Sequence, residues 1–297
     1  ILENDAAKRA AVRVSSEHGG SPICGEIFKY ADKSLGLIVP CRSLEYLDLL
    51  LSSDAEVDVN VDFYAADENP VNYRPKELLK SAAVRVKDKK WYRFPAGIAD
   101  AKGGKVFTLI RRMPPVRVWG ERENYGGFVS FTVPGDRLEY DTFLTVVNED
   151  SNLPYTACNR YRECAGNYAA AHLTDGHIAP YAAPKMWMSA EMGRGGEWIE
   201  FDFGKKVRFQ EVELVFNSNL NAKSFTPAMN RVASEIVKKY AVVLANGGKE
   251  EIYFADGGNF KRFVRIEKPA EAEKVVVRIE ETHGSRYAQV FDVRINT

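Results

Sequence analysis

Residues 196–216 read GEWIEFDFGKKVRFQEVELVF, and this stretch decides the fold class. Apolar and polar residues alternate in it, which is typical of a β-strand with one buried face and one solvated face. The pattern predicts two strands, at 198–203 and 210–216. In the first of these strands the core face would carry Ile199, Phe201 and Phe203, and the other face Trp198, Glu200 and Asp202.

Short β-rich runs bounded by Gly, Pro, Asn and Asp recur along the whole chain, whereas helical periodicity is scarce. This pattern predicts an all-β protein built as a sandwich. One short helix is expected at 76–81, and the segment 222–235 is expected to be a long loop. The remaining strands are expected at 44–51, 58–64, 82–86, 90–94, 106–111, 239–244, 251–254, 260–266, 275–280 and 289–295.

The second half of the chain repeats the strand order of the first half with few identical residues, which indicates duplicated structure. We therefore expect two tandem β-sandwiches, at 1–150 and 151–297, which meet near the turn-forming run NEDSNLP (148–154). The aligned runs are LEYLDLLLSS (44–53) with FQEVELVFNS (209–218), VDVNVDFYAAD (57–67) with VKKYAVVLANG (237–247), KDKKWYRFP (87–95) with GNFKRFVRIEKP (258–269), and KVFTLIRR (105–112) with KVVVRIEE (274–281).

Charge is balanced, with 41 Lys and Arg against 41 Asp and Glu, so no net field would attract nucleic acid. The basic and aromatic runs KKWYRFP (89–95) and RRMPPVRVWG (111–120) are accordingly interpreted as solvated strand faces. Trp91 and Trp119 are expected to pack between the two sandwiches or against a further domain. No run approaches the roughly 18 apolar residues that cross a bilayer, so no membrane span is expected.

Cys158 and Cys164 lie close together in a polar stretch, and two interpretations are open for them: a local disulfide or two separate thiols. No C-x-x-C pair of the kind found in zinc sites is present. His172 and His177 lie near each other but have no third His or Cys nearby, which makes them weak candidates for zinc. We expect them to donate hydrogen bonds instead.

The order of motifs in the second half resembles that of discoidin, or coagulation factor 5/8 type C, domains, which are galactose-binding-like jelly rolls. The resemblance covers about half of the chain, and the ordering is more specific than any one motif. It implies that the predicted sandwiches are jelly rolls of this class. The motifs are Asp175-Gly176, Trp187-x-Ser189, the stretch 196–216, a strand ending in NGG (246–248) and KVVVRIEETHGSRYAQVFDVRI (274–295).

Both halves together resemble the C-terminal region of bacterial (Bacteroides-type) FAD-dependent oxidoreductases. That resemblance implies an accessory region whose partner is an N-terminal catalytic flavin domain, and a periplasmic or extracellular location. The chain starts at Ile1, which fits a region excised from a longer protein. No cofactor is expected within it, because GRGG (193–196) precedes a strand and is interpreted as a turn. The motifs are AAVRVSSE (10–17), YRP (73–75), KWYRFP (90–95) and FNSNLN (216–221).

The Asp175-Gly176 turn has two interpretations. The resemblance implies a structural Ca²⁺ near it, with Asp175 and Asp292 as the acidic ligands, since Ca²⁺ is bound by oxygen atoms. The alternative is a plain turn in which the aspartate caps its own backbone and the glycine takes positive φ. Trp187 is expected to fill the end of the sandwich as a core residue.

Sugar binding needs an aromatic face and planar polar groups in a rim of loops, and the loops of the second half supply both. We therefore expect a non-catalytic accessory region that binds glycans or acts as a scaffold. The alternatives are an enzyme that acts on glycosides through loop-borne residues and a spacer or oligomerisation module. The candidate ligand-binding residues are His177, Tyr181, Asn217, Asn219, Asn221, His283 and Arg286; the three asparagines are also ordinary turn formers.

Overall fold

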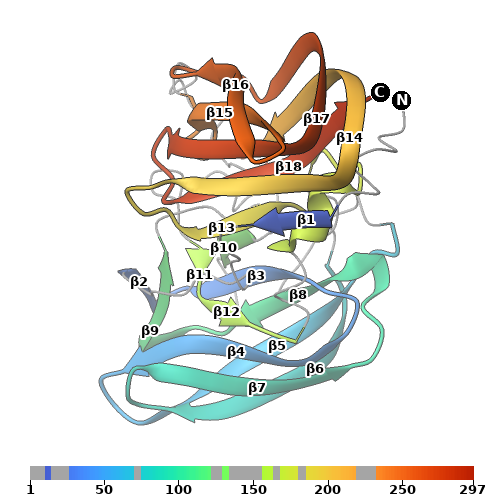
Figure 1. The fold of residues 1–297 in the computed structure, drawn as a ribbon. Coiled ribbons are helices and arrows are strands. Elements are labelled where there is room, and N and C mark those ends of the chain that lie inside the picture. Colours follow the sequence, from blue (N-terminus) through green and yellow to red (C-terminus); the bar gives the residue numbers. More distant parts are fainter. Residues whose placement is uncertain are drawn as a thin grey trace.

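A computed structural model describes residues 11–14, 27–69, 75–121, 129–133, 156–162, 168–179, 185–218 and 232–297 (Figure 1). Within these ranges the regular structure is antiparallel β-sheet, apart from the short 3-10 helices η1 (Lys102–Gly104) and η3 (Ala170–Thr174). The strands form two stacked sandwiches, with the second half of the chain in the upper one in Figure 1. The predicted fold class, all-β with two tandem jelly-roll sandwiches, is confirmed.

The first sandwich has two sheets in the part of the chain that the structure describes. One has the order β10-β3-β8-β5-β6; the other has the order β11-β9-β4-β12, with β2 on β9 and β7 on β4. These strands are β2 (Ile27–Ala31), β3 (Ser34–Pro40), β4 (Leu44–Ser53), β5 (Val57–Ala66), β6 (Pro75–Val86), β7 (Lys90–Ile98), β8 (Lys105–Ile110), β9 (Met113–Glu121), β10 (Val129–Val133), β11 (Thr156–Ala157) and β12 (Asn159–Arg160).

The second sandwich is one curled sheet of order β13-β18-β14-β17-β15-β16, with β1 on β14. Its longest strands, β14 and β17, have 20 residues each and curve through both layers (Figure 1). Their pairing shifts register between Asp202 and Val207, an irregularity of the kind that bends strands. The strands are β1 (Ala11–Val14), β13 (Trp187–Glu191), β14 (Glu197–Phe216), β15 (Val237–Asn246), β16 (Lys249–Asp256), β17 (Phe263–Thr282) and β18 (Tyr287–Asn296).

The two sandwiches have the same pairing scheme. In the first sandwich β4 pairs with β7 and β9. In the second sandwich the second part of β14, from residue 207 on, pairs in the same way with the first part of β17, up to residue 272, and with β18. β5 pairs with β6 and β8, as β15 pairs with β16 and the second part of β17. β3 lies between β10 and β8, as the first part of β14 lies between β1 and β17. The four segments that the sequence aligns contain β4, β5, most of β7, β8 and their counterparts in β14, β15 and the two parts of β17, so the repeated order of these strands is confirmed.

Short strands from each half of the chain pair with the opposite sandwich. β1 pairs with β14 through Ala11↔Asp202 to Val14↔Ile199. In the other direction, β11 pairs with β9 and β12 with β4. The division at 150 and 151 stays a prediction, and these pairings add that the two halves exchange edge strands.

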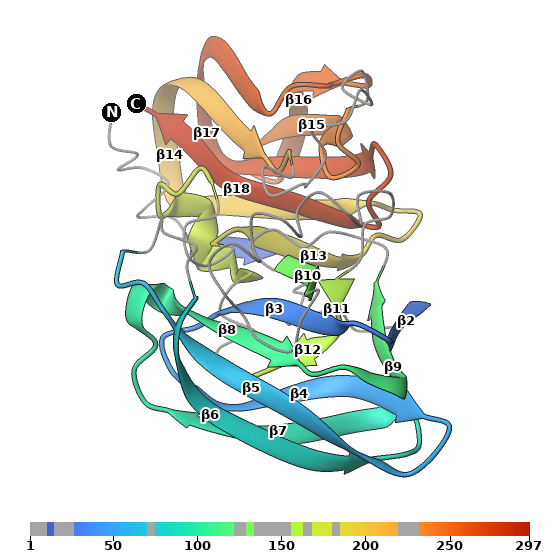
Figure 2. The same cartoon turned by 180° about the vertical axis from the view of Figure 1, so that it is seen from behind.

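The apolar core crosses from one sandwich to the other at β13. Trp187 is fully buried inside the second sandwich, whereas its neighbours Met186 and Met188 belong to the core cluster of the first. Phe291 of β18 and Val215 of β14 face the first sandwich in the same way. The layer formed by β13, β14 and β18 is therefore apolar on both faces. It is the layer of the second sandwich that faces the first sandwich in Figure 2.

The structure corrects three expectations. Residues 76–81 belong to the edge strand β6 and not to a helix; this strand is largely exposed, so its sequence lacks the strand alternation. The strands predicted separately around 204 and around 270 are continuous in β14 and β17. Trp91 and Trp119 do not pack between the two sandwiches: they lie half-buried on the outer face of the first sandwich, because Tyr92 and Val118 take the core side of their strands. Their packing against a further domain stays a prediction.

Candidate functional site

The Asp175-Gly176 segment forms the plain turn that the sequence allows. It follows η3, and Asp175 Oδ1 accepts a hydrogen bond from the backbone N–H of His177 at 2.8 Å. Gly176 has a φ of 79°, in the region that favours glycine. The interpretation as a capped turn is confirmed.

Two histidines surround the carboxylate of Asp175. His172 Nδ1 lies 2.7 Å from Oδ2, and His177 Nδ1 lies 3.0 Å from Oδ1, although the latter is not aligned as a hydrogen bond. Burial disfavours ionisation of Asp175, but the hydrogen bonds from His172 and His177 outweigh it and lower the pKa of the carboxyl group. The site holds a carboxylate that is stabilised by its neighbours.

His177 faces the scaffold on both ring nitrogens. Its Nε2 lies 3.1 Å from Lys185 Nζ, and its Nδ1 lies beside Asp175. Lys185 has a φ of 46°, unusual for a residue other than glycine. This backbone conformation costs about 1–2 kcal/mol. The side chain that contacts His177 therefore comes from a strained backbone position. These contacts hold the imidazole in place, and its side chain is 37% exposed, so its role in ligand binding stays a prediction.

Asn217 and His283 also hold the loops together. Asn217 is 1% exposed, and its Nδ2 donates to Gln289 Oε1 at 2.7 Å. His283 Nε2 lies 2.6 Å from the backbone oxygen of Asn259, and its backbone N–H donates to Ile236 O. Asn217 therefore has almost no surface for a ligand, and His283 connects three loops at the end of the sandwich.

Of the other predicted site residues, Arg286 is partly exposed, lying 3.7 Å from Glu191 Oε1 and over the ring of Tyr287. Cys158 is buried, and Cys164 lies outside the described residues, so the disulfide stays a prediction. The other predicted ligand residues outside the described part of the chain are Tyr181, Asn219 and Asn221.

An arginine that the sequence does not single out lies at the centre of this rim. Arg262 donates a hydrogen bond from Nη2 to Ile178 O, which links the start of β17 to the loop after the Asp175 turn. Its Cζ lies 4.9 Å from the centroid of the Phe263 ring and 5.6 Å from that of Phe291. We call the surface formed by Ile178, Phe260, Arg262 and Phe263 the Arg262 patch.

The Arg262 patch combines an unsatisfied donor with exposed apolar side chains. Arg262 Nε is buried and has no hydrogen-bond partner, and burial lowers the pKa of its guanidinium. Phe260 is 64% exposed, Phe263 is 54% exposed and Ile178 is 39% exposed. Large apolar side chains normally lie inside a protein. Their concentration around one arginine marks this part of the rim as a candidate binding surface.

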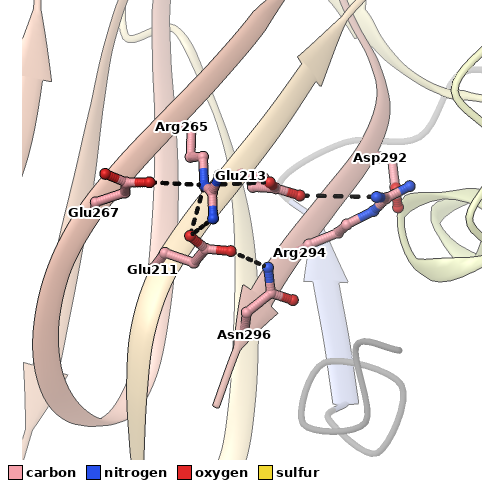
Figure 3. A network of polar contacts seen from close by, with 7 residues as sticks. All are labelled: Glu211, Glu213, Arg265, Glu267, Asp292, Arg294 and Asn296. Carbon is pink, nitrogen blue, oxygen red and sulfur yellow. Dashed lines mark hydrogen bonds and ion pairs between the residues drawn. The ribbon is translucent and has the colours of Figure 1, made fainter. Parts of the chain in front are cut away.

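Asp292 belongs to a polar network on strands β14, β17 and β18 (Figure 3). Its Oδ2 accepts from Arg294 Nε at 2.6 Å. Burial raises the pKa of Asp292, although Arg294 opposes that shift. In the same network Arg265 contacts Glu211 and Asn296 donates to Glu211 Oε1 at 2.7 Å. The network also includes Glu213 and Glu267.

The described residues do not fit a calcium site. Ca²⁺ takes six to eight oxygen ligands, whereas the Asp175 carboxylate is occupied by two imidazoles and that of Asp292 by Arg294. Within the described ranges no group of three or more His, Cys, Asp or Glu side chains could hold a metal ion. We therefore assign no role to calcium in the described part of the chain. The same ranges contain no helix long and apolar enough to span a membrane.

No protein-family model matches the sequence, and no curated protein matches it. Among solved structures, the chain is similar to chitosan-binding module 2, in complex with chitotriose, of a chitosanase/glucanase from Paenibacillus sp. IK-5; identity is 13% and the TM-score 0.34, over 44% of this chain and 88% of that one. It is also similar to the family 32 carbohydrate-binding module of Clostridium perfringens NanJ in complex with galactose, at 15% identity and a TM-score of 0.33, over 44% and 85% of the two chains. A third is CpGH89CBM32-5 from Clostridium perfringens, in complex with GalNAc-β-1,3-galactose, at 11% identity and a TM-score of 0.35, over 46% and 89%. The fold assignment rests on the strand pairing.

Replacing Asp175 by asparagine is expected to destabilise the protein more at neutral pH than in acid. The folded pKa of Asp175 lies below its ordinary value of 3.8, so its contribution to stability is present above the unfolded pKa and is lost as the pH falls through the folded pKa. Urea unfolding of Asp175→Asn and the parent at about pH 7 and about pH 2 measures this difference. Asp256→Asn is the control, because Asp256 caps Gly258 N in a similar turn. An equal loss of stability at both pH values would contradict the interpretation.

Proposed function

We propose that this chain is a non-catalytic accessory region that binds carbohydrate through the Arg262 patch. The observation that carries the proposal is Arg262, whose guanidinium lies beside the exposed ring of Phe263, with the exposed Phe260 two residues earlier in the chain. Aromatic faces accept the apolar side of a sugar ring, and a few fixed polar groups orient its hydroxyls. The patch supplies both types of group on neighbouring residues.

The geometry supports weak binding of a chain end or branch. Arg262 is already oriented by Ile178 O and by the rings of Phe263 and Phe291, so little side-chain entropy is lost when a ligand binds. The patch lies at the surface and buries only part of a ligand, which limits affinity. In this proposal the histidines and Asn217 hold the loops in place, and Arg262 and its neighbours contact the sugar.

The proposed context of the chain rests on resemblance. An accessory region of a FAD-dependent oxidoreductase from a polysaccharide-degrading bacterium would hold its catalytic domain close to a glycan. Such a protein would act in the periplasm or outside the cell. The amino-acid sequence that precedes Ile1 in the natural protein tests this context, because a strand followed by G-x-G-x-x-G and a helix would identify the flavin domain.

The binding proposal is tested with a glycan array, followed by titration calorimetry with the glycan that is retained most strongly. Arg262→Gln is expected to weaken binding about tenfold, because hydrogen bonds to a charged group contribute about 1.5–3 kcal/mol. Phe263→Ala is expected to weaken it by a similar factor. Arg208→Gln is the matched control, since Arg208 is exposed on β14 and paired with Glu271.

Three outcomes would oppose the proposal. Absence of retention on every glycan favours a spacer or oligomerisation module. If Arg208→Gln weakens glycan binding as much as Arg262→Gln does, the weaker binding of Arg262→Gln reflects the loss of a positive charge and not a contact in the Arg262 patch. Turnover of a glycoside by this chain favours an enzyme with loop-borne catalytic residues.

A further inference from the structure

The outer face of the first sandwich carries a dense set of aromatic and cationic side chains. On β4, β7 and β9 the alternate residues Leu49, Phe94 and Val118 are buried in the core, so the residues between them point outward. We call this surface the β9–β4 face. Its aromatic residues are Phe28, Tyr30, Tyr46, Trp91 and Trp119, and its cationic residues are Lys89, Arg93, Arg117 and Arg160.

The strand register places these residues in rows across the sheet. Phe28 of β2 lies opposite Trp119 of β9, and Leu50 of β4 lies opposite Trp91 of β7. Trp119 is joined to β4 by a hydrogen bond from Nε1 to Ser52 Oγ at 2.9 Å. With strands about 4.8 Å apart, the row from β2 to β7 spans roughly 14 Å. This width suits an extended chain-like ligand.

Three rings on this face hold cations at fixed positions. Lys89 Nζ lies 3.5 Å from the centroid of the Trp119 ring. Arg160 Cζ lies 3.8 Å from the centroid of Trp91, and Arg93 Cζ lies 3.7 Å from that of Tyr46. Cation–π contacts of this kind orient the charged group. An incoming anion therefore meets side chains that are already ordered.

Two of the arginines on this face are paired with aspartates. Arg93 binds Asp48 through two hydrogen bonds of 2.8 and 2.9 Å, and Arg117 Nη2 lies 2.6 Å from Asp54 Oδ1. Arg160 is exposed and has no carboxylate partner among the residues that the structure describes. The N–H edge of a stacked guanidinium can bind a carboxylate or sulfate with two hydrogen bonds. Arg160 thus keeps its positive charge beside the ring of Trp91.

Exposed rings lie beside these charges. Phe28 is 40% exposed and Tyr30 is 44% exposed, and their centroids are 5.3 Å apart in an edge-to-face arrangement. Arg117 Cζ lies 5.3 Å from both rings, and its Nε donates to Tyr30 Oη at 3.3 Å. The pair offers an apolar surface of the type that packs against a sugar ring.

We propose that the β9–β4 face binds an acidic polysaccharide, in which carboxylate groups alternate with apolar ring faces. The proposal concerns a different surface from the Arg262 patch and does not depend on it. A nucleic acid strand has a phosphate on every nucleotide and is bound through many unpaired cations. Here Asp48 and Asp54 neutralise Arg93 and Arg117, which fits a ligand of lower charge density.

The test uses the full chain with sodium polygalacturonate in affinity gel electrophoresis and calorimetry, with neutral galactan and oligothymidylate as comparison probes. Lys89→Gln combined with Arg160→Gln is expected to weaken binding to polygalacturonate about tenfold or more. Phe28→Ala combined with Tyr30→Ala is expected to weaken it by a similar factor. Binding by the parent is expected to weaken as salt is added.

The matched control is Arg85→Gln combined with Lys102→Gln, which removes two exposed positive charges elsewhere on the first sandwich. This control is expected to change binding less than twofold, and the melting temperature of all variants is measured to show that they fold. The proposal is overturned if the parent does not bind polygalacturonate, if the control weakens binding equally, if galactan binds as tightly, or if oligothymidylate binds more tightly.

Discussion

Replacing Trp187 by alanine is expected to lower the free energy of unfolding by about 3–5 kcal/mol, the usual cost of removing a buried Trp or Phe side chain. Trp187 is 0% exposed and belongs to the core of the second sandwich. On either side of it, Met186 and Met188 belong to the core of the first. The strand therefore cannot shift to fill the cavity without disturbing two packed layers. Urea unfolding of Trp187→Ala measures the loss.

Trp198→Ala is the matched control, because Trp198 has the same side chain but is 36% exposed on the opposite face of its strand from Ile199. We expect a loss below about 1 kcal/mol for it. Equal losses for the two variants would show that Trp187 is not a core residue. A loss of glycan binding by Trp187→Ala without a loss of stability would make it a sugar platform instead.

Replacing Gly196 by alanine is expected to destabilise the protein by about 2 kcal/mol or more. Gly196 has a φ of 69°, and an added Cβ would lie 2.3 Å from the backbone oxygen of Ile279. The contact atom belongs to Ile279 of β17, which is paired with Glu197 of β14 and with Tyr240 of β15, so it cannot move away as a flexible side chain would. Gly196 N–H also donates to Gly193 O at 3.0 Å, which confirms the GRGG segment as a turn.

Gly195→Ala is the matched control for that loss, because it adds the same methyl group at a position that has neither the positive φ nor the close backbone contact of Gly196. Gly195 lies next to Gly196, has no positive φ, and an added Cβ there meets no atom within 4 Å. Thermal unfolding of Gly195→Ala is expected to show a change within about 0.5 kcal/mol of the parent. If Gly196→Ala also changes the free energy of unfolding by less than about 0.5 kcal/mol, Gly196 does not lie as close to the backbone of Ile279 as the structure places it.

The first part of β14 could be predicted from its alternation of buried and solvated residues. β4 and β15 each contain five consecutive buried residues, and they were predicted from their β-rich sequence and their shared order, which also predicted the duplicated pairing. β3 was missed because its seven residues are all buried, so no alternation exists. The first half of β6, at 76–81, was interpreted as a helix because it is exposed at the edge of a sheet, whereas its second half, at 82–86, was predicted as a strand.

The two proposed binding surfaces were less predictable. Asp175 and Gly176 form a local turn, which residue preferences specify directly. Arg262 and Ile178 are far apart in the sequence, and their contact depends on how two loops meet at the end of the sandwich. The β9–β4 face was visible as basic and aromatic runs, but the direction of Trp91 and Trp119 depends on the strand register.

The layer that is apolar on both faces has a consequence for avidity. Because Met186 and Phe291 pack on the first sandwich while Trp187 packs inside the second, the two sandwiches are held together by a shared core instead of a flexible linker. The proposed binding surfaces, the Arg262 patch and the β9–β4 face, are then presented at a fixed distance and angle. A polysaccharide long enough to reach both would gain effective concentration at the second contact, whereas a short oligosaccharide would not.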